Sequence, residues 1–271
     1  MLLPPFRRPE GQAGLDAIRA APGRALIASD FDGTLSPIVP DPMSARAYPG
    51  AVRALSRLAD AGSTVAIITG RSAADAVALG GLAEVPGLIV VGHYGAQRWQ
   101  AGEVITAAAP DGVARARELL PEVIAGLRDP GRIWIEDKGT GLVVHTRRAA
   151  DPAGTLELLR APVTDLATRA GLAVEPGRFV LELRPHGMDK GQALRSLAVE
   201  RDAAAVLFCG DDLGDLSAFA AARALRAAGI AACTVASASP EVPEVAEAAD
   251  LVVDGPAGVV ALLSALADAV T

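Results

Sequence analysis

The chain has 271 residues, of which 51% are hydrophobic and 21% charged, a composition typical of a globular protein with a sizeable core. Its formal net charge is -7 and only 3% of its residues are aromatic. These values argue against nucleic-acid binding, because nucleic-acid binders usually carry a basic excess and stacking aromatics. The sequence has neither a long apolar run nor the apolar region of a signal peptide. We therefore expect a cytoplasmic protein with no membrane or nucleic-acid partner. The sequence leaves the oligomeric state open.

Both ends of the chain predict one α/β core, since short apolar runs alternate with helical patterns as in a parallel sheet covered on both faces. The expected strands are 25–29, 64–69, 88–92, 205–209, 231–236 and 251–253. The expected helices are 50–61, 72–80, 190–200, 213–228 and one from residue 256.

The middle of the chain has a different pattern and predicts an inserted α+β module with antiparallel strands. Helices are expected near 110–128 and 151–170, and each is followed by a hairpin. The hairpin strands are 133–136 with 142–146, and 172–176 with 178–184, the second pair turning at Pro176-Gly177. We therefore expect three segments: core residues 1–105, an inserted module at 106–184 and core residues 185–271.

Several other residues have structural interpretations. Cys209 and Cys233 lie in apolar strands and are expected to be core residues rather than a disulfide. Trp99 and Trp134 are expected to pack, and the pairs Arg7-Arg8 and Arg147-Arg148 to be solvated.

Polar residues gather where the predicted core strands end, at the edge where open α/β sheets bind ligands. Asp30 and Asp32 follow the first strand, and Thr69-Gly70-Arg71-Ser72 follows the second. Gly210-Asp211-Asp212 follows a later strand, and Lys190 begins the helix that returns from the inserted module. Four distant segments therefore bring carboxylates, a cation and hydroxyls to one edge.

This set of groups favours phosphoryl transfer. Mg²⁺ binds carboxylate oxygens and would offset the repulsion among Asp30, Asp32 and Asp211. The turn at Gly33 and Thr34 can direct backbone N–H groups at phosphate oxygens. Thr69 and Lys190 can bind the same phosphate by a hydrogen bond and a charge. One carboxylate would then act as nucleophile, forming an aspartyl-phosphate, and its neighbour as acid and base.

Each motif alone has an ordinary explanation. Two aspartates two residues apart also occur in helix caps and nucleotide-sugar transferases, and Asp189, Asp211 or Asp212 could simply begin a helix. A receiver domain for phosphotransfer and a catalytically silent sugar-phosphate sensor are two further functional classes. An inserted module argues against the receiver, and the intact set of groups argues against the sensor.

In this order, the four segments resemble the haloacid dehalogenase superfamily of phosphatases, with DFDGTL, Thr69, Lys190 and GDD at 210–212 as its four motifs. The resemblance implies a Rossmann-like core with a parallel sheet and an inserted cap of the αββαββ type. More narrowly, the chain is similar to the trehalose-6-phosphate phosphatase family. The similar segments are DFDGTLSPIVPDP (30–42), ITGRS (68–72), VGHYGAQRW (91–99), EDKGTGLVVHTR (136–147), ELRPHGMDKGQAL (182–194) and GDDLGDLSAF (210–219).

The family resemblance implies Mg²⁺-dependent hydrolysis of trehalose 6-phosphate, a sugar phosphate, through an aspartyl-phosphate. Asp30 would be the nucleophile, and Asp32 the acid and then the base. Asp30, Asp32 through its carbonyl and Asp211 would hold Mg²⁺, assisted by Asp212 or Asp215. Phosphate would bind at Gly33, Thr34, Thr69, Gly70, Arg71 and Lys190. The sugar would contact Gln97 and the cap residues Glu136, Lys138, His145, Arg147, Glu182 and Arg184, each of which could instead be ordinary hairpin surface.

Three residues depart from the family pattern. Gly214 and Leu216 replace Thr and Glu of the fourth motif, and Gln97 stands where the family usually has an acid. The aspartates remain, so metal binding is little affected. A phosphatase for another glycosyl or sugar phosphate is therefore the alternative function.

Overall fold

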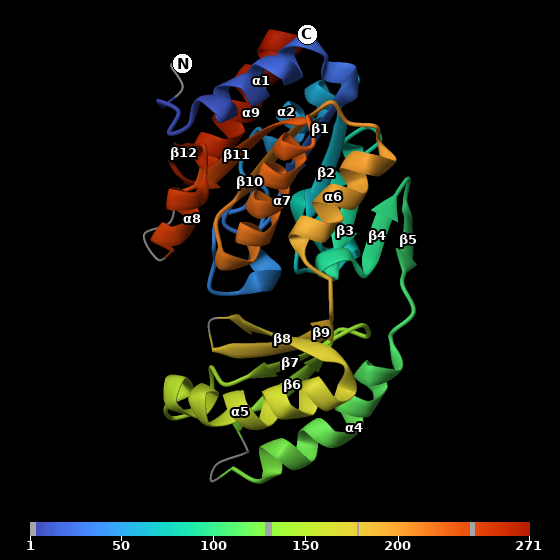
Figure 1. The fold of residues 1–271 in the computed structure, drawn as a ribbon, viewed down its shortest axis with the longest axis vertical. Helices are drawn as coiled ribbons and strands as arrows, with labels where there is room; N and C mark the ends of the chain where they lie inside the picture. Colours follow the sequence, from blue (N-terminus) through green and yellow to red (C-terminus); the bar gives the residue numbers. More distant parts are fainter. Residues whose placement is uncertain (1–3, 128–131, 178, 239–241) are drawn as a thin grey trace. The chain divides into compact units, whose positions relative to one another are not determined.

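The computed structural model describes residues 4–127, 132–177, 179–238 and 242–271. The chain divides into two compact units, shown in Figure 1. Met1–Ile105 and Asp189–Thr271 form the first, here the core unit, and Thr106–Met188 form the second, here the cap unit. Each unit has its own hydrophobic core.

The core unit is built on an eight-stranded sheet in the order β12-β11-β10-β1-β2-β3-β4-β5. Neighbouring strands from β12 to β3 are parallel, and β4 pairs with β3 in the antiparallel sense. The expected parallel sheet is therefore confirmed. The strands are β1 (Ala25–Ser29), β2 (Thr64–Ile68), β3 (Ile89–Gly92), β4 (Gln97–Gln100), β5 (Glu103–Thr106), β10 (Ala205–Gly210), β11 (Ala231–Ser237) and β12 (Leu251–Val253).

Helices cover both faces of this sheet, as the two-sided apolar strands require. In β1, Ile27 belongs to one buried cluster, while Leu26 and Ala28 belong to the other. One face packs against α1 (Pro9–Ala20), α2 (Ala51–Asp60), α3 (Ala73–Gly80) and α9 (Gly255–Val270). The other packs against α6 (Lys190–Glu200), α7 (Leu216–Ala227) and α8 (Pro243–Ala248).

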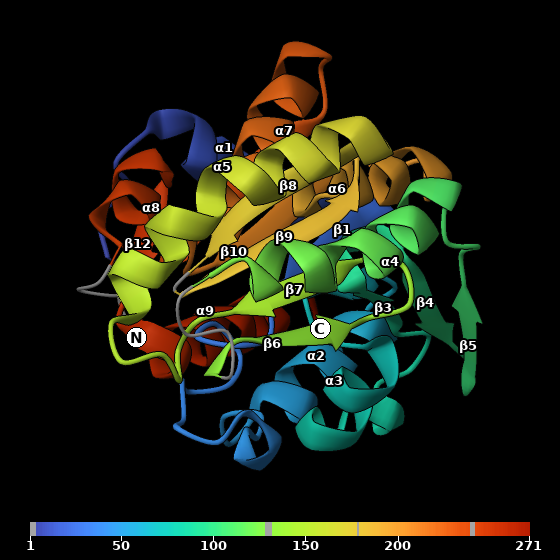
Figure 2. The same ribbon diagram turned by 90° about the horizontal axis from the view of Figure 1, so that it is seen from below.

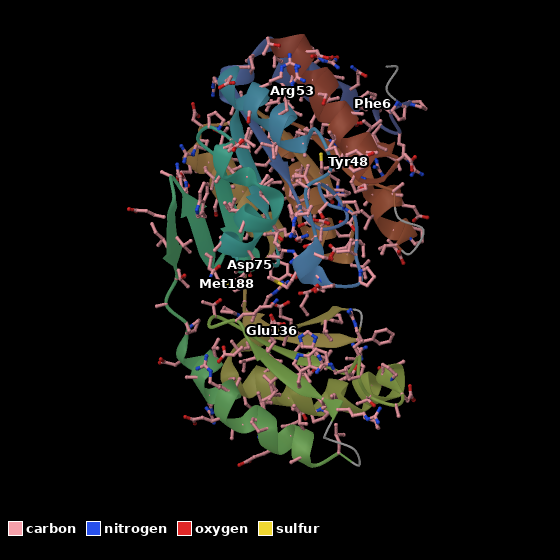
Figure 3. All side chains as sticks on the ribbon, turned by 180° about the vertical axis from the view of Figure 1, so that it is seen from behind. Phe6, Tyr48, Arg53, Asp75, Glu136 and Met188 are labelled. Carbon is pink, nitrogen blue, oxygen red and sulfur yellow. The ribbon has the colours of Figure 1, made fainter. Side chains whose placement is uncertain are left out.

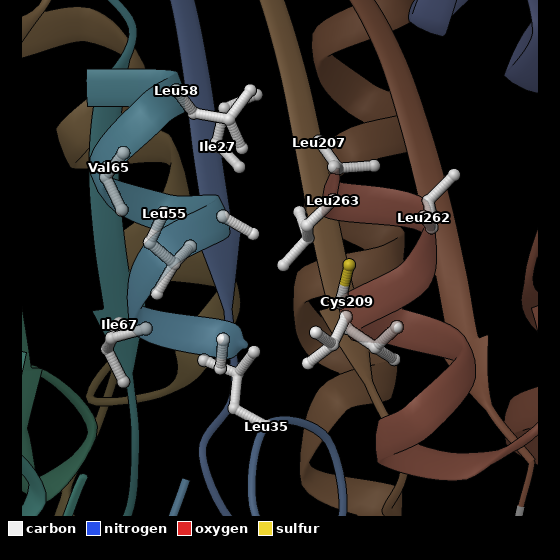
Figure 4. Close-up of a cluster of buried hydrophobic side chains, with 14 of the residues drawn as sticks. Ile27, Leu35, Leu55, Leu58, Val65, Ile67, Leu207, Cys209, Leu262 and Leu263 are labelled. Atoms are coloured by element: carbon white, nitrogen blue, oxygen red, sulfur yellow. The ribbon is translucent and has the colours of Figure 1, made fainter. Parts of the chain in front are cut away.

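The cysteines are core residues, as expected. Figure 4 shows Cys209 among leucine and isoleucine side chains between the sheet, α2 and α9. Cys233 is buried in the same cluster, and both cysteines are free thiols. Burial raises the pKa of Cys209 to about 12, so this thiol is kept protonated.

The cap unit is a four-stranded antiparallel sheet with two helices, and the expected α+β insertion is confirmed. The sheet order is β6-β7-β9-β8. Figure 2 shows both helices on one face of the sheet, where they enclose a separate apolar core. The elements are α4 (Asp111–Ala125), β6 (Trp134–Asp137), β7 (Leu142–His145), α5 (Pro152–Ala170), β8 (Leu172–Gly177) and β9 (Val180–Pro185).

Two expectations were wrong, and four elements, α1, β4, β5 and α8, had not been expected at all. Pro176 and Gly177 do not form the expected turn, because β8 runs through Gly177, which pairs with Val180. Arg7 and Arg8 are not merely solvated: their guanidinium groups donate four hydrogen bonds to backbone carbonyls of residues 246–249, at the C-terminal end of α8. These cations complement the negative end of that helix dipole. None of the described helices is both long enough and apolar enough to cross a bilayer.

Candidate active site

Asp30 lies directly after β1 and is almost completely buried. Its backbone N–H donates to the carbonyl of Cys209 at 2.9 Å, which extends the β1–β10 pairing by one residue. Its Oδ2 lies 2.9 Å from Nζ of Lys190. The parallel pairing of β1 with β10 therefore brings the first acidic segment next to the one at residues 210–212.

Lys190 begins α6 and joins the two acidic segments. Its ammonium group lies 2.8 Å from Oδ1 of Asp215 and 3.6 Å from Oδ1 of Asp212, in addition to Asp30. The other oxygen of Asp215 accepts hydrogen bonds from the backbone N–H groups of Asp211 and Asp212, at 2.9 and 3.1 Å. Both oxygens of Asp215 are therefore used to position the lysine and the loop.

The turn after Asp32 fits closely against Asp211. Gly33 has φ +74°, and a Cβ atom there would lie 1.9 Å from Oδ2 of Asp211, so only glycine fits. The hydroxyl of Thr34 donates to Oδ1 of Asp211 at 3.0 Å, and Ser237 donates to the carbonyl of Gly33 at 2.7 Å. Asp211 is thus oriented by the DFDGT turn itself.

Asp32 is paired with Arg71 rather than with Lys190. Two parallel hydrogen bonds, of 2.5 and 2.6 Å, join the guanidinium to the two carboxylate oxygens. These bonds raise the pKa of Arg71, which stays charged. Thr69 is buried, and its Oγ1 accepts from the backbone N–H of Arg71 at 3.2 Å. The loop after β2 therefore holds the second carboxylate of the motif.

The carboxylates around Lys190 outnumber the single positive charge that this lysine supplies. Burial, added to repulsion from neighbouring carboxylates, raises the pKa of Asp211 to about 8 and of Asp215 to about 6. Burial also raises the pKa of Asp30 well above its ordinary value, although Lys190 opposes this shift. Asp212, which faces solvent, instead has a lowered pKa: desolvation raises it, but Lys190 and hydrogen bonds to its carboxylate outweigh the desolvation.

A divalent cation fits this arrangement. Carboxylate oxygens of Asp30, Asp212 and Asp215 lie within 4.8 Å of one another, and hard cations such as Mg²⁺ bind oxygen ligands. A cation would also relieve the repulsion that raises the pKa values of these acids. Both oxygens of Asp215 already bind Lys190 and two backbone N–H groups, so within this group Asp30 and Asp212 are the better-placed donors.

Tyr94 belongs to this edge, although the sequence motifs did not select it. It follows β3 with φ +57°, a strained conformation for a residue with a side chain. Its N–H donates to the carbonyl of Thr69 at 3.1 Å, and its ring lies so close to Gly70 that a Cβ there would meet the phenol oxygen at 2.6 Å. The rule that ligands bind at strand ends would have pointed to it, since it follows the third parallel strand.

Gln97 has a different environment from the aspartates around Lys190. It begins β4, and its Oε1 accepts a hydrogen bond of 3.0 Å from the backbone N–H of Ala73, at the first turn of α3. This bond satisfies one of the N–H groups that a helix leaves without a partner in its first turn. Gln97 therefore supports the start of α3, and its NH₂ group is its remaining polar end.

The six candidate sugar contacts of the cap lie in the other unit. Those in paired strands alternate onto the face of the small sheet that α4 and α5 do not cover. Figure 3 shows Glu136 on this side of the sheet. We call it the open face. Its cross-strand neighbours include Trp134 with His145, and Val143 with Glu182.

Two ion pairs and one hydrogen bond join the polar groups of the open face. Nζ of Lys138 lies 3.0 Å from Glu182 and Nη2 of Arg184 lies 2.7 Å from Glu175, while Nε2 of His145 lies at hydrogen-bond distance, 2.9 Å, from Glu136. Arg147 differs: it follows β7 in an exposed turn, and no hydrogen bond or ion pair links it to another residue within the described ranges. The structure thus groups five of the six candidates on one face and leaves Arg147 apart.

Comparisons with known proteins give the family of the chain. The profile of the family described as trehalose-phosphatase matches residues 28–255. The trehalose-phosphate phosphatase of Mycobacterium marinum is 39% identical over 215 residues, which cover 72% of this chain and 51% of that protein. The chain therefore spans about half the length of this curated relative.

Solved structures share the fold. The C-terminal domain of Candida albicans trehalose-6-phosphate phosphatase is similar with a TM-score of 0.77 and 23% identity over 98% of each chain. A haloacid dehalogenase-like hydrolase from Bacteroides thetaiotaomicron has a TM-score of 0.65 and 17% identity over 89% of this chain and 99% of its own. These likenesses concern the fold, which is the Rossmann-like core with a cap that the four motifs predicted. Because the family profile matches residues 28–255, this chain belongs to the trehalose-phosphatase family.

Proposed function

We propose that this chain hydrolyses trehalose 6-phosphate to trehalose and phosphate through an aspartyl-phosphate on Asp30. The observation that carries the proposal is the buried contact of 2.9 Å between Asp30 and Lys190, with Asp212 and Asp215 within the same cluster. Such a carboxylate is held at the end of a strand beside a fixed positive charge, where a phosphate would bind. Family membership supplies the substrate class.

In the first step, Asp30 attacks phosphorus and the bond from phosphorus to the sugar O6 breaks. Asp32 donates its proton to O6 as the sugar leaves. The charge on Lys190 and the hydroxyl of Thr69 stabilise the phosphoryl oxygens as charge develops on them. In the resting structure both oxygens of Asp32 accept from Arg71, so one of these two hydrogen bonds opens when Asp32 carries the proton, and the other keeps the carboxyl group oriented.

In the second step, Asp32 takes a proton from water as that water attacks phosphorus. The bond from phosphorus to Asp30 breaks, phosphate leaves and the free carboxylate of Asp30 is restored. The same residue therefore serves as acid and then as base, which returns the site to its starting protonation state.

The site is suited to Mg²⁺, which Asp30, Asp211, Asp212 and the Asp32 carbonyl would hold. When bound, this cation would neutralise the carboxylates and withdraw charge from the phosphoryl oxygens. The chain's own part is to hold the donors in place: Thr34 and Gly33 fix Asp211, and Asp215 fixes the loop that carries Asp212.

The open face of the cap would recognise the sugar. Its paired charges offer hydrogen-bond donors and acceptors, and an uncharged polyhydroxyl ligand can use both. We assign this role to Glu136, Lys138, His145, Glu182 and Arg184, while Gln97 can donate from its NH₂ group in the core unit. Residues of the core would bind the phosphate.

Phosphate release from a panel of sugar phosphates tests the proposal. We expect turnover with Mg²⁺ that is highest for trehalose 6-phosphate and is lost when the cation is chelated. Panel members are sucrose 6-phosphate, glucose 6-phosphate and glucosylglycerol phosphate. A better turnover of any of them would contradict the substrate assignment, and full activity after chelation would contradict the metal.

One observation favours the alternative, a phosphatase for another glycosyl or sugar phosphate. Where the family usually has an acid, the Gln97 amide binds the start of α3 through its oxygen. An acid in this place could make charge-assisted bonds to sugar hydroxyls, each worth about 1.5–3 kcal/mol, and the amide makes weaker ones. The same panel separates the two functions.

A further inference from the structure

Three planar side chains lie together on the open face of the cap. The rings of Trp134 and His145 are stacked, with centroids 4.2 Å apart and planes inclined by 6°. The guanidinium carbon of Arg148 lies 4.5 Å from the centroid of the Trp134 ring. Oε2 of Glu136 lies 2.9 Å from Nε2 of the stacked His145. Trp134 therefore touches a predicted sugar contact and an arginine that the sequence had treated as solvated.

Trp134 contributes little to the cap's own core. The strand alternation places its neighbours Ile133 and Ile135 on the opposite face, where they pack against the buried cluster under α4 and α5. Trp134 is absent from all hydrophobic clusters found among the described residues. A large aromatic ring that does not fill a core, and that holds two polar groups, has the chemistry of a binding surface.

Arg148 has the geometry that Arg147 lacks. The guanidinium carbon of Arg148 lies over the face of the Trp134 ring, in a cation–π contact that holds the charged group beside the open face. Within the described part of the chain, the N–H donors of this group have no hydrogen-bond acceptor, and the side chain is exposed. Such an arginine is already oriented, so less conformational entropy is lost when a hydroxyl-rich ligand binds.

We propose that Trp134, His145 and Arg148 form the sugar-selecting element of the cap, with Trp134 as the positioning residue and Arg148 as the donor. This assignment deepens the proposed function and rests on it. The ligand class is the uncharged second ring of a disaccharide phosphate, whose hydroxyl oxygens accept from the guanidinium. Arg147, which the family pattern had suggested, is secondary to Arg148.

The test is substrate selectivity, measured as kcat/KM for trehalose 6-phosphate divided by kcat/KM for p-nitrophenyl phosphate, which has no sugar. We expect Arg148→Ala and Trp134→Leu to lower this ratio by about tenfold or more, mainly through KM for the sugar substrate. Trp134→Phe, which keeps a ring, should restore most of the ratio. Arg160→Ala on α5, an exposed arginine paired with Glu157, is the matched control and should leave the ratio at its original value.

A structural role alone would lower both activities together and leave the ratio unchanged, which would overturn the proposal. A larger effect of Arg147→Ala than of Arg148→Ala would also overturn it. The thermal midpoint of each variant shows whether it folds. If Arg148→Ala does not fold, Arg148→Lys replaces it, because lysine keeps the charge but lacks the planar guanidinium. If the parent enzyme prefers another sugar phosphate, that substrate enters the ratio. The proposed function then fails while the selectivity test still decides the role of the stack.

Discussion

At the scale of single residues, the proposed site depends on close contacts around the carboxylate of Asp211. Gly33 combines a left-handed backbone with contact to this carboxylate, and Thr34 donates to it. Asp30 and Lys190 are equally constrained, because both are buried and paired. In the proposed function, the turn DFDGT is therefore both a support for the metal donors and the source of the two carboxylates that we assign to catalysis.

Gly33→Ala tests this constraint, with Gly87→Ala as its matched control. Gly87 has φ +62° and nothing within 4 Å of an added Cβ, so its substitution isolates the backbone cost of about 1–2 kcal/mol in the free energy of unfolding. We expect Gly33→Ala to cost more than this and to remove turnover, because the new methyl displaces Asp211. Denaturant unfolding and phosphate release measure the two effects. Equal stabilities with retained turnover would refute the close fit.

Most core site residues could be predicted from the sequence, whereas their partners could not. The apolar strands and the helix beside Asp30, Asp211 and Lys190 are evident from the sequence. Their position at the same edge of the sheet was therefore predictable. The pairing of Asp32 with Arg71, and the position of Tyr94, depend on side-chain directions that no spacing encodes. Trp134 was expected to pack in a core because aromatic residues usually do.

At the scale of elements, burial decided which strands and helices were predictable. The parallel strands β1, β2, β3, β10 and β11 are apolar on both faces, and all were expected from the sequence. In contrast, β4 and β5 are polar or exposed and lie at one end of the sheet, so periodicity gave no indication of them. Similarly, α8 has only six residues, too few for a helical pattern.

The cap strands show how alternation separates two roles within one element. Ile135 in β6 and Ile133 just before it pack against the buried cluster under the helices, while Trp134 and Glu136 face the open side. A shift of register by one residue would exchange these sets and bury the charges. The pattern that stabilises the cap core is thus the one that places the candidate sugar contacts on a single face.

At the scale of the whole molecule, the acidic cluster should link stability to pH and to divalent cations. The folded chain holds protons on Asp211 and Asp215 up to about pH 8 and 6, whereas an unfolded chain releases them near its ordinary carboxyl pKa of 3.8. The folded state therefore binds more protons over this interval, and the free energy of unfolding of the metal-free protein decreases as pH rises through it.

We accordingly expect the thermal midpoint in a chelating buffer to fall between about pH 6 and 8. Added Mg²⁺ should raise the midpoint more at the higher pH, because the cation binds ionised carboxylates. Differential scanning calorimetry at the two pH values measures this, and Asp211→Asn should weaken the pH dependence. An equal shift by Mg²⁺ at both pH values would contradict the cation site.

The central claim, that Asp30 carries the phosphoryl group, is tested most directly by pre-steady-state kinetics of Asp32→Asn with p-nitrophenyl phosphate and Mg²⁺. This substrate has a good leaving group that needs little acid assistance, so phosphorylation should proceed while hydrolysis, which needs the base, is slow. We predict a burst of one p-nitrophenol per active chain, with the phosphoryl group located on Asp30 by peptide mass analysis. No burst, or a phosphoryl group on another residue, would contradict the account.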